Sequence, residues 1–102
     1  MRLTLLQTEP VWRDVARSIE QAGGLLEGAG PADVYVLPEM WATGFDAELA
    51  EPTRRGSAEA LEWMLAAACR LDAAVAGTLP WPEADDGSWR NRFFFVTPQG
   101  VA

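Results

Sequence analysis

The residue best placed to do chemistry in this sequence is Glu39, within the Leu-Pro-Glu-Met-Trp segment at 37–41. The stretch 33–37 is almost entirely apolar after its first residue and predicts a buried strand. Pro38 marks the end of that strand, because proline cannot donate to a sheet ladder. A side chain just past the carboxyl end of a parallel strand lies where open α/β sheets bind ligands. With methionine and tryptophan beside it, Glu39 is expected to lie partly out of water and to serve as a general base; the alternative is a solvated loop glutamate.

The rest of the composition excludes several other kinds of chemistry. The sequence contains no histidine and no lysine, so it has no Ser-His-Asp or Cys-His relay, no imidazole metal ligand and no Schiff-base lysine. Its one cysteine, Cys69, falls near the carboxyl end of a predicted helix among alanines, where nothing activates a thiol. We therefore expect Cys69 to be a small packing residue and expect no metal site.

The charge balance excludes further classes of partner. The 8 basic residues, all arginine, and 15 acidic residues give a net charge of −7 without a basic cluster, which argues against a nucleic-acid partner. No apolar run approaches the length of about 18 residues that a membrane span requires, and the first residues run directly into a strand-like segment rather than a signal peptide. We therefore expect a protein that binds no membrane. A lone cysteine cannot form an internal disulfide and fits a reducing compartment, so we expect the protein to be cytoplasmic.

The elements that would position Glu39 begin with a strand, a helix and a second strand. The first strand is predicted at 3–7. The helix that follows is capped by Asp14 and ends at the Gly-Ala-Gly-Pro segment at 28–31. One apolar stripe of this helix comprises Val15, Ile19, Ala22 and Leu26. The strand at 3–7, this helix and the strand at 33–37 form a βαβ unit, which implies that the two strands are parallel and joined by a right-handed crossover.

The second half of the chain predicts a long loop, a helix and two strands. Residues 41–56 show no periodicity, and Ser57 is expected to cap the next helix. The buried face of that helix is expected to carry Leu61, Met64, Leu65, Ala68 and Leu71. Strands follow at 73–79 and 92–96, and alternate phenylalanines in the latter are expected to leave one sheet face open. A turn at 97–100 is followed by only two residues, so we expect residues 1–102 to be the truncated N-terminal part of one larger domain.

Several of these segments resemble the start of the nitrilase, or carbon–nitrogen hydrolase, superfamily. The resemblance rests on Val-Leu-Pro-Glu-Met at 36–40, Ala-Gly-Thr-Leu-Pro at 76–80 and Asn-Arg-Phe-Phe-Phe-Val-Thr-Pro-Gln-Gly at 91–100. The segment Trp-Ala-Thr-Gly-Phe at 41–45 is similar to the omega-amidase branch. The resemblance covers essentially all 102 residues, in order and in register. It implies an α/β fold, the N-terminal half of an α-β-β-α sandwich, in the order β-α-β-loop-α-β-β.

The resemblance also implies a reaction. The family hydrolyses small carboxylic amides through a cysteine thioester with a Glu-Lys-Cys triad and without cofactor or metal, and Glu39 matches the glutamate that acts as general base. Trp41 and Phe45 either line the acyl-binding pocket or pack in the core or a lid. The branch implies omega-amides of 2-oxo acids, such as 2-oxoglutaramate, as substrates, and a homo-oligomer of the full-length protein.

Two of the three triad members have no counterpart in these residues. The family's lysine and nucleophilic cysteine would follow the last residue of the sequence, so the chain alone is expected to be inactive. Because two helices suffice to cover only one face of the sheet, the chain is also expected to be poorly stable as a monomer. The alternative function is a non-catalytic remnant of the nitrilase fold, or an interaction module, that pairs with another chain.

Overall fold

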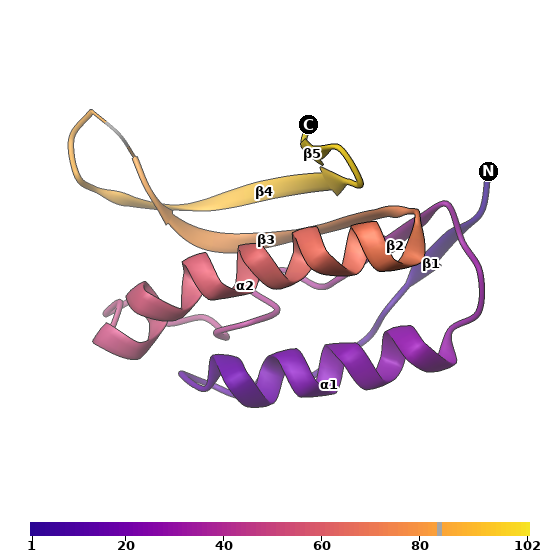
Figure 1. Ribbon diagram of the computed structural model, residues 1–102. Helices are drawn as coiled ribbons and strands as arrows, with labels where there is room; N and C mark the ends of the chain where they lie inside the picture. The colour runs from indigo at the N-terminus through magenta and orange to yellow at the C-terminus, as the bar shows by residue number, and fades with distance from the viewer. Residues whose placement is uncertain (84) are drawn as a thin grey trace.

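The computed structural model describes residues 1–83 and 85–102, which form a five-stranded sheet with two helices on one side (Figure 1). The elements are β1 (Leu3–Leu5), α1 (Val15–Gly28), β2 (Val34–Val36), α2 (Glu51–Leu71), β3 (Ala74–Pro82), β4 (Trp89–Thr97) and β5 (Gly100–Val101). The predicted order of strands and helices is confirmed, and so is the α/β class. The turn after β4 leads into one short additional strand, β5.

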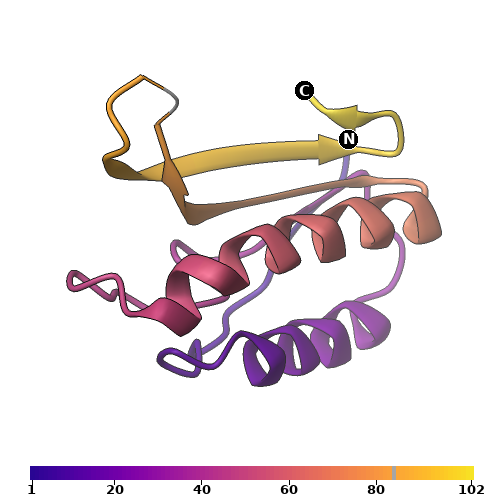
Figure 2. The same cartoon turned by 60° about the vertical axis from the view of Figure 1, so that its left-hand side comes forward.

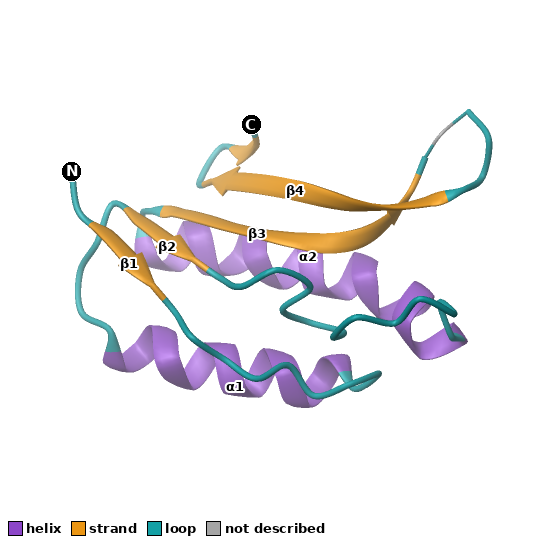
Figure 3. Ribbon diagram, turned by 180° about the vertical axis from the view of Figure 1, so that it is seen from behind, coloured by secondary structure: helices purple, strands orange, loops and turns teal. Residues whose placement is uncertain are grey.

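The sheet has the strand order β1-β2-β3-β4-β5, so each strand pairs with its neighbour in the sequence. β1, β2 and β3 run parallel, whereas β3–β4 and β4–β5 are antiparallel. Parallel neighbours need a crossover connection, which α1 and α2 provide. As a result, the carboxyl ends of β1 and β2 face the same edge of the sheet, and the loop at 37–50 leaves from that edge (Figure 3).

α1 forms as the sequence predicts, because its signals are local. The Asp14 carboxylate accepts a hydrogen bond from the Arg17 amide at 3.1 Å, which satisfies an amide that the first turn leaves free. Three residues of the predicted stripe, Val15, Ala22 and Leu26, are buried. The helix ends at Gly28, followed by a glycine with positive φ at position 30.

α2 begins earlier than predicted, at Glu51 rather than after Ser57. Ser57 lies buried inside the helix, where its hydroxyl donates to the Thr53 carbonyl at 3.0 Å. The start is stabilised from outside the helix, because the Asp46 carboxylate accepts from the amide of Ala50, at 2.9 Å, and from the Thr53 hydroxyl, at 2.8 Å. A loop side chain therefore anchors the start of the helix, which has no side-chain cap of its own, and only 37–50 is irregular.

The two faces of the sheet differ sharply, because the helices cover only one of them (Figure 2). On the covered face, Phe94 and Val96 are buried against the core. On the other face, which we call the open face, four large apolar side chains are exposed: Leu3, Leu5, Phe93 and Phe95, with exposed fractions of 57%, 74%, 62% and 36%. Leu5 pairs with Val36 of β2, Val36 pairs with Ala76 of β3, and Ala76 pairs with Phe95 of β4. Because paired residues point to the same face of a sheet, and every second residue of a strand does so too, these four side chains lie on one face. The predicted open face is confirmed.

Candidate active site

Glu39 lies just past β2, at the carboxyl ends of the parallel strands, as predicted. The backbone on either side of it is fastened to β3. The Leu37 amide donates to the Ala76 carbonyl at 2.7 Å, and the Met40 amide donates to the Thr78 hydroxyl oxygen at 2.8 Å. Met40 adopts a positive φ of 53°, so the chain turns sharply immediately after Glu39. These contacts fix where the glutamate leaves the sheet.

The Glu39 side chain is held by β4. The Asn91 side-chain amide donates from Nδ2 to Oε2 of Glu39 at 2.8 Å, across 52 positions of sequence. The prediction that Glu39 lies partly out of water is wrong for this chain, because the residue is exposed. The aromatic neighbour that was expected to shield it, Trp41, instead turns into the core on the covered side of the sheet.

Trp41 has the role that was left open as the alternative, that of a core residue. Its side chain is 1% exposed and packs against Trp63 of α2, with ring centroids 5.2 Å apart. Phe45, by contrast, is 68% exposed, and its carbonyl accepts a hydrogen bond from the Trp12 indole at 3.3 Å. In this chain the two predicted pocket residues therefore do not line one cavity with Glu39.

An ion pair that the sequence analysis missed fastens the loop that follows Glu39. The Asp46 carboxylate, 1% exposed, accepts two hydrogen bonds from the Arg13 guanidinium, at 3.0 Å from Nε and 2.9 Å from Nη2. These bonds hold the pKa of Asp46 well below its usual range, with help from the bonds to Ala50 and Thr53. Arg13 and Asp46 are 33 residues apart in the sequence, and neither belongs to a sequence motif that would have indicated the pairing.

A small cavity opens between this loop and the far end of the β3–β4 hairpin. Its volume is about 180 Å³, which suits a molecule of a few heavy atoms. It is lined by Met40, Asp46, Ala47, Leu49, Pro80, Trp89, Arg90 and Asn91. Asn91 thus belongs both to this cavity and to the Glu39 contact, whereas Glu39 itself is not one of the lining residues.

The prediction that Cys69 is a small packing residue is wrong. It is exposed on α2, and its Sγ lies 3.5 Å from the carbonyl oxygen of Pro98. α2 ends just before β3 starts, and the first residue of β3, Ala74, pairs with the first residue of β2. Cys69 therefore lies near the amino ends of the parallel strands, at the opposite end from Glu39.

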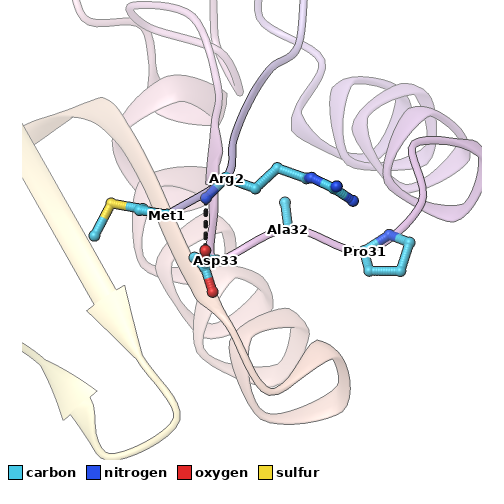
Figure 4. Close-up of a pocket in the computed structure, with 5 residues that line it drawn as sticks. All are labelled: Met1, Arg2, Pro31, Ala32 and Asp33. Carbon is cyan, nitrogen blue, oxygen red and sulfur yellow. Dashed lines mark hydrogen bonds between the residues drawn. The ribbon is translucent and has the colours of Figure 1, made fainter.

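A second hollow, of about 450 Å³, also lies at the amino ends of the parallel strands. It is lined by Met1, Arg2, Pro31, Ala32 and Asp33 (Figure 4). The carboxylate that lines this hollow is that of Asp33, which accepts a hydrogen bond from the Arg2 amide at 2.6 Å.

Among the residues that the structure describes, no group of three or more acidic or cysteine side chains could hold a metal ion. In the same part of the chain, neither helix has the length and apolar character needed to cross a membrane.

The fold and the Glu-containing turn after β2 define a class of protein. The chain belongs to the carbon-nitrogen hydrolase family, whose profile matches residues 2–102. It is 36% identical over 101 residues to the omega-amidases YafV of Yersinia enterocolitica and of Escherichia coli K12. In both cases the match covers 99% of this chain and 38% of the relative, so the chain spans well under half the length of these proteins.

Solved structures match over the whole chain. XC1258 from Xanthomonas campestris, a CN-hydrolase superfamily protein with an arsenic adduct in its active site, superposes with a TM-score of 0.87 at 28% identity. The superposition covers 100% of this chain and 38% of XC1258. An N-terminal amidase solved with a Gln-Gly peptide gives a TM-score of 0.85 at 17% identity, covering 100% of this chain and 26% of that one. The latter likeness shows the fold alone.

Proposed function

We propose that residues 1–102 are the part of an omega-amidase that carries its general base, Glu39. The observation that carries the proposal is the placement of this carboxylate. It lies at the carboxyl ends of the parallel strands, with its backbone fastened to β3 and one oxygen held by Asn91. Among the described residues no hydrogen bond occupies Oε1, so that oxygen is available to accept a proton. Membership of a hydrolase family and 36% identity to relatives named omega-amidase support the same reaction.

In the proposed reaction Glu39 accepts the proton of a cysteine thiol as the sulfur attacks the amide carbonyl carbon. The tetrahedral intermediate collapses with cleavage of the C–N bond, and the nitrogen leaves as ammonia after taking up the proton that Glu39 holds, which returns Glu39 to its carboxylate form. Water then attacks the resulting thioester, again with its proton passing to Glu39, and releases the carboxylic acid and the thiol. A lysine stabilises the oxyanion.

The nucleophile and the lysine of this proposal come from outside these 102 residues. The sequence contains no lysine, and Cys69 lies near the amino ends of the strands that carry Glu39 at their carboxyl ends. Substrates are small omega-amides of 2-oxo acids such as 2-oxoglutaramate, without a cofactor or metal. In the whole protein, the exposed ring of Phe45 contributes to the substrate pocket, while Trp41 supports the same loop from the core. We place the enzyme in the cytoplasm, as a homo-oligomer.

The test is ammonia release by a fusion protein. Residues 1–102 are joined to the part of the Escherichia coli YafV relative that lies outside the matched 38%. We expect the fusion to release ammonia from 2-oxoglutaramate faster than from glutamine, whereas the 102-residue chain alone releases none from either. A folded fusion that leaves both amides intact contradicts the proposal, as does activity of the chain alone.

A non-catalytic interaction module is the second candidate, and the open face favours it. Leu3, Leu5, Phe93 and Phe95 together form an apolar surface of the kind that marks interaction sites. The two candidates differ in the same assay: a module predicts a fusion that folds, with a cooperative unfolding transition, and hydrolyses neither amide.

A further inference from the structure

We propose that Asn91 is a positioning residue for catalysis, which fixes the orientation of the Glu39 carboxylate for proton transfer. The inference rests on the proposed function of Glu39 and deepens it by naming the group through which the base is aimed. It follows from one contact, the 2.8 Å hydrogen bond from Nδ2 of Asn91 to Oε2 of Glu39.

The β3–β4 hairpin holds both ends of the Glu39 residue. Thr78 of β3 accepts a hydrogen bond from the amide that follows Glu39, and Asn91 of β4 donates to its carboxylate. The two contacts come from neighbouring positions of one ladder, since Asn91 pairs with Pro80, two residues beyond Thr78. A glutamate that is fixed at its backbone and at one carboxylate oxygen has few orientations left.

Such restraint matters because a glutamate side chain is flexible. Without it the side chain samples several rotamers, and ordering it for proton transfer costs free energy. Rate falls steeply when a catalytic group is misplaced, by about 100-fold for a displacement of roughly 1 Å. A bond that already selects one orientation in the free protein removes this cost before substrate arrives.

The chemistry of the donor also suits a base. The carboxamide of Asn91 donates a hydrogen bond but carries no charge, so it orients the carboxylate without a cation that would oppose proton uptake. It occupies Oε2 and leaves Oε1 for the proton. An arginine or lysine at this position would hold the carboxylate equally well and would make it a weaker base.

A purely structural role for Asn91 has little to support it. The residue is exposed, and Glu39 is the one partner that its side chain bonds among the described residues. The strand pairing of β4 depends on backbone groups rather than on this amide. Substitution of Asn91 should therefore alter the carboxylate and leave the sheet in place.

The first experiment measures kcat, KM and pH dependence in the fusion protein for Asn91→Ala and Asn91→Asp. Arg92→Gln is the matched control, because Arg92 is adjacent and its guanidinium lies over the Phe94 ring on the other face, 5.6 Å from the centroid. In Asn91→Ala we expect kcat to fall about 10-fold to 100-fold with KM changed by less than about threefold. In Asn91→Asp we expect a larger fall at neutral pH and partial recovery as the pH falls, because one proton shared by the two carboxylates restores a hydrogen bond.

Two results of that experiment overturn the proposal. One is an Asn91→Ala enzyme whose kcat equals that of Arg92→Gln. The other is an Asn91→Asp enzyme whose pH profile has the same shape as that of Asn91→Ala, because a role in packing alone cannot produce a difference in pH dependence.

The second experiment separates this inference from the proposed function, because it does not depend on turnover. The side-chain amide signals of Asn91 are followed by NMR in the 102-residue chain as the pH is lowered. We expect them to shift with protonation of Glu39 and to lose that shift in Glu39→Gln. If the wild-type fusion hydrolyses no amide, the proposed function fails, and the NMR result still decides whether Asn91 holds Glu39. Asn91 signals that do not respond to Glu39 overturn the positioning role.

Discussion

Gly77 of β3 lies where the core meets the loop that carries Glu39, and Gly77→Ala tests how tightly the two are joined. A Cβ at this position would lie 2.9 Å from Cδ1 of Trp41 and 3.2 Å from Cβ of Leu37. Ordinary carbon contacts are about 3.5–4.0 Å, so the Trp41 ring would have to move by at least about 0.6 Å. That ring is 1% exposed and packs against Trp63, so it has no free space to enter.

The expected cost follows from two opposing effects. Overpacking a well-filled core costs about 1–3 kcal/mol. Replacing glycine by alanine returns about 0.4–1 kcal/mol, because it reduces the conformational freedom of the unfolded chain. The steric effect wins, and we expect Gly77→Ala to lower the free energy of unfolding by about 1–2 kcal/mol. In the fusion protein the same change should also lower kcat, because Trp41 lies two residues after Glu39.

The assay is urea unfolding followed by far-UV circular dichroism, in a double-mutant cycle with Trp41→Phe. The smaller ring gives the new methyl group room and also removes an indole N–H that, among the described residues, is buried without a hydrogen-bond partner. We expect the cost of Gly77→Ala to fall close to zero in the Trp41→Phe background. Gly24→Ala is the control, because nothing lies within 4 Å of its Cβ position, and it should stabilise α1 by about 0.5–1 kcal/mol. A Gly77→Ala cost that is the same with either residue at position 41 refutes the reasoning.

Three further predictions concern the loop, the thiol and the open face. Asp46→Asn should destabilise the chain, and the deficit relative to wild type should be full above about pH 5 and shrink as the pH falls further. The reason is that Arg13 depresses the pKa of Asp46 in the folded state, so this stabilisation is present above the carboxyl group's ordinary pKa and is lost on acidification; parallel unfolding curves at low and neutral pH are the check. Cys69 is exposed and should react with a maleimide in the native chain at a rate near that of the unfolded chain; protection by more than about 10-fold in native buffer contradicts its placement. Phe93→Ser should reduce self-association of the 102-residue chain in sedimentation velocity, because Phe93 is 62% exposed on the open face, and an unchanged sedimentation coefficient argues against that face as the contact.

The parts of the fold that the sequence predicts are those with local causes. α1 follows from the Asp14 cap and a helical stripe, both contained within one segment of chain. The alternation of Phe93, Phe94 and Phe95 predicts one buried and two exposed rings, because strand side chains alternate between faces. Position 39 at the end of a strand follows from the apolar run and the proline after it.

The parts that the sequence does not predict depend on distant residues. The start of α2 is placed too late, because it has no side-chain cap and is held instead by Asp46 of the preceding loop, which bonds Ala50 and Thr53. The exposure of Glu39 is missed because it depends on which face Trp41 enters. The contact between Glu39 and Asn91 spans 52 positions, and no periodicity or spacing in a single sequence connects two residues so far apart.

The most direct test of the central claim is the rate of ammonia release from 2-oxoglutaramate by the fusion protein with and without the Glu39 carboxylate. Glu39→Gln keeps the size and polarity of the side chain and removes its ability to accept a proton. Because proton transfer by a positioned base contributes at least about 100-fold, the variant should be slower by that factor or more, with an unchanged circular dichroism spectrum. A Glu39→Gln fusion that releases ammonia at the wild-type rate would contradict the assignment of Glu39 as the general base.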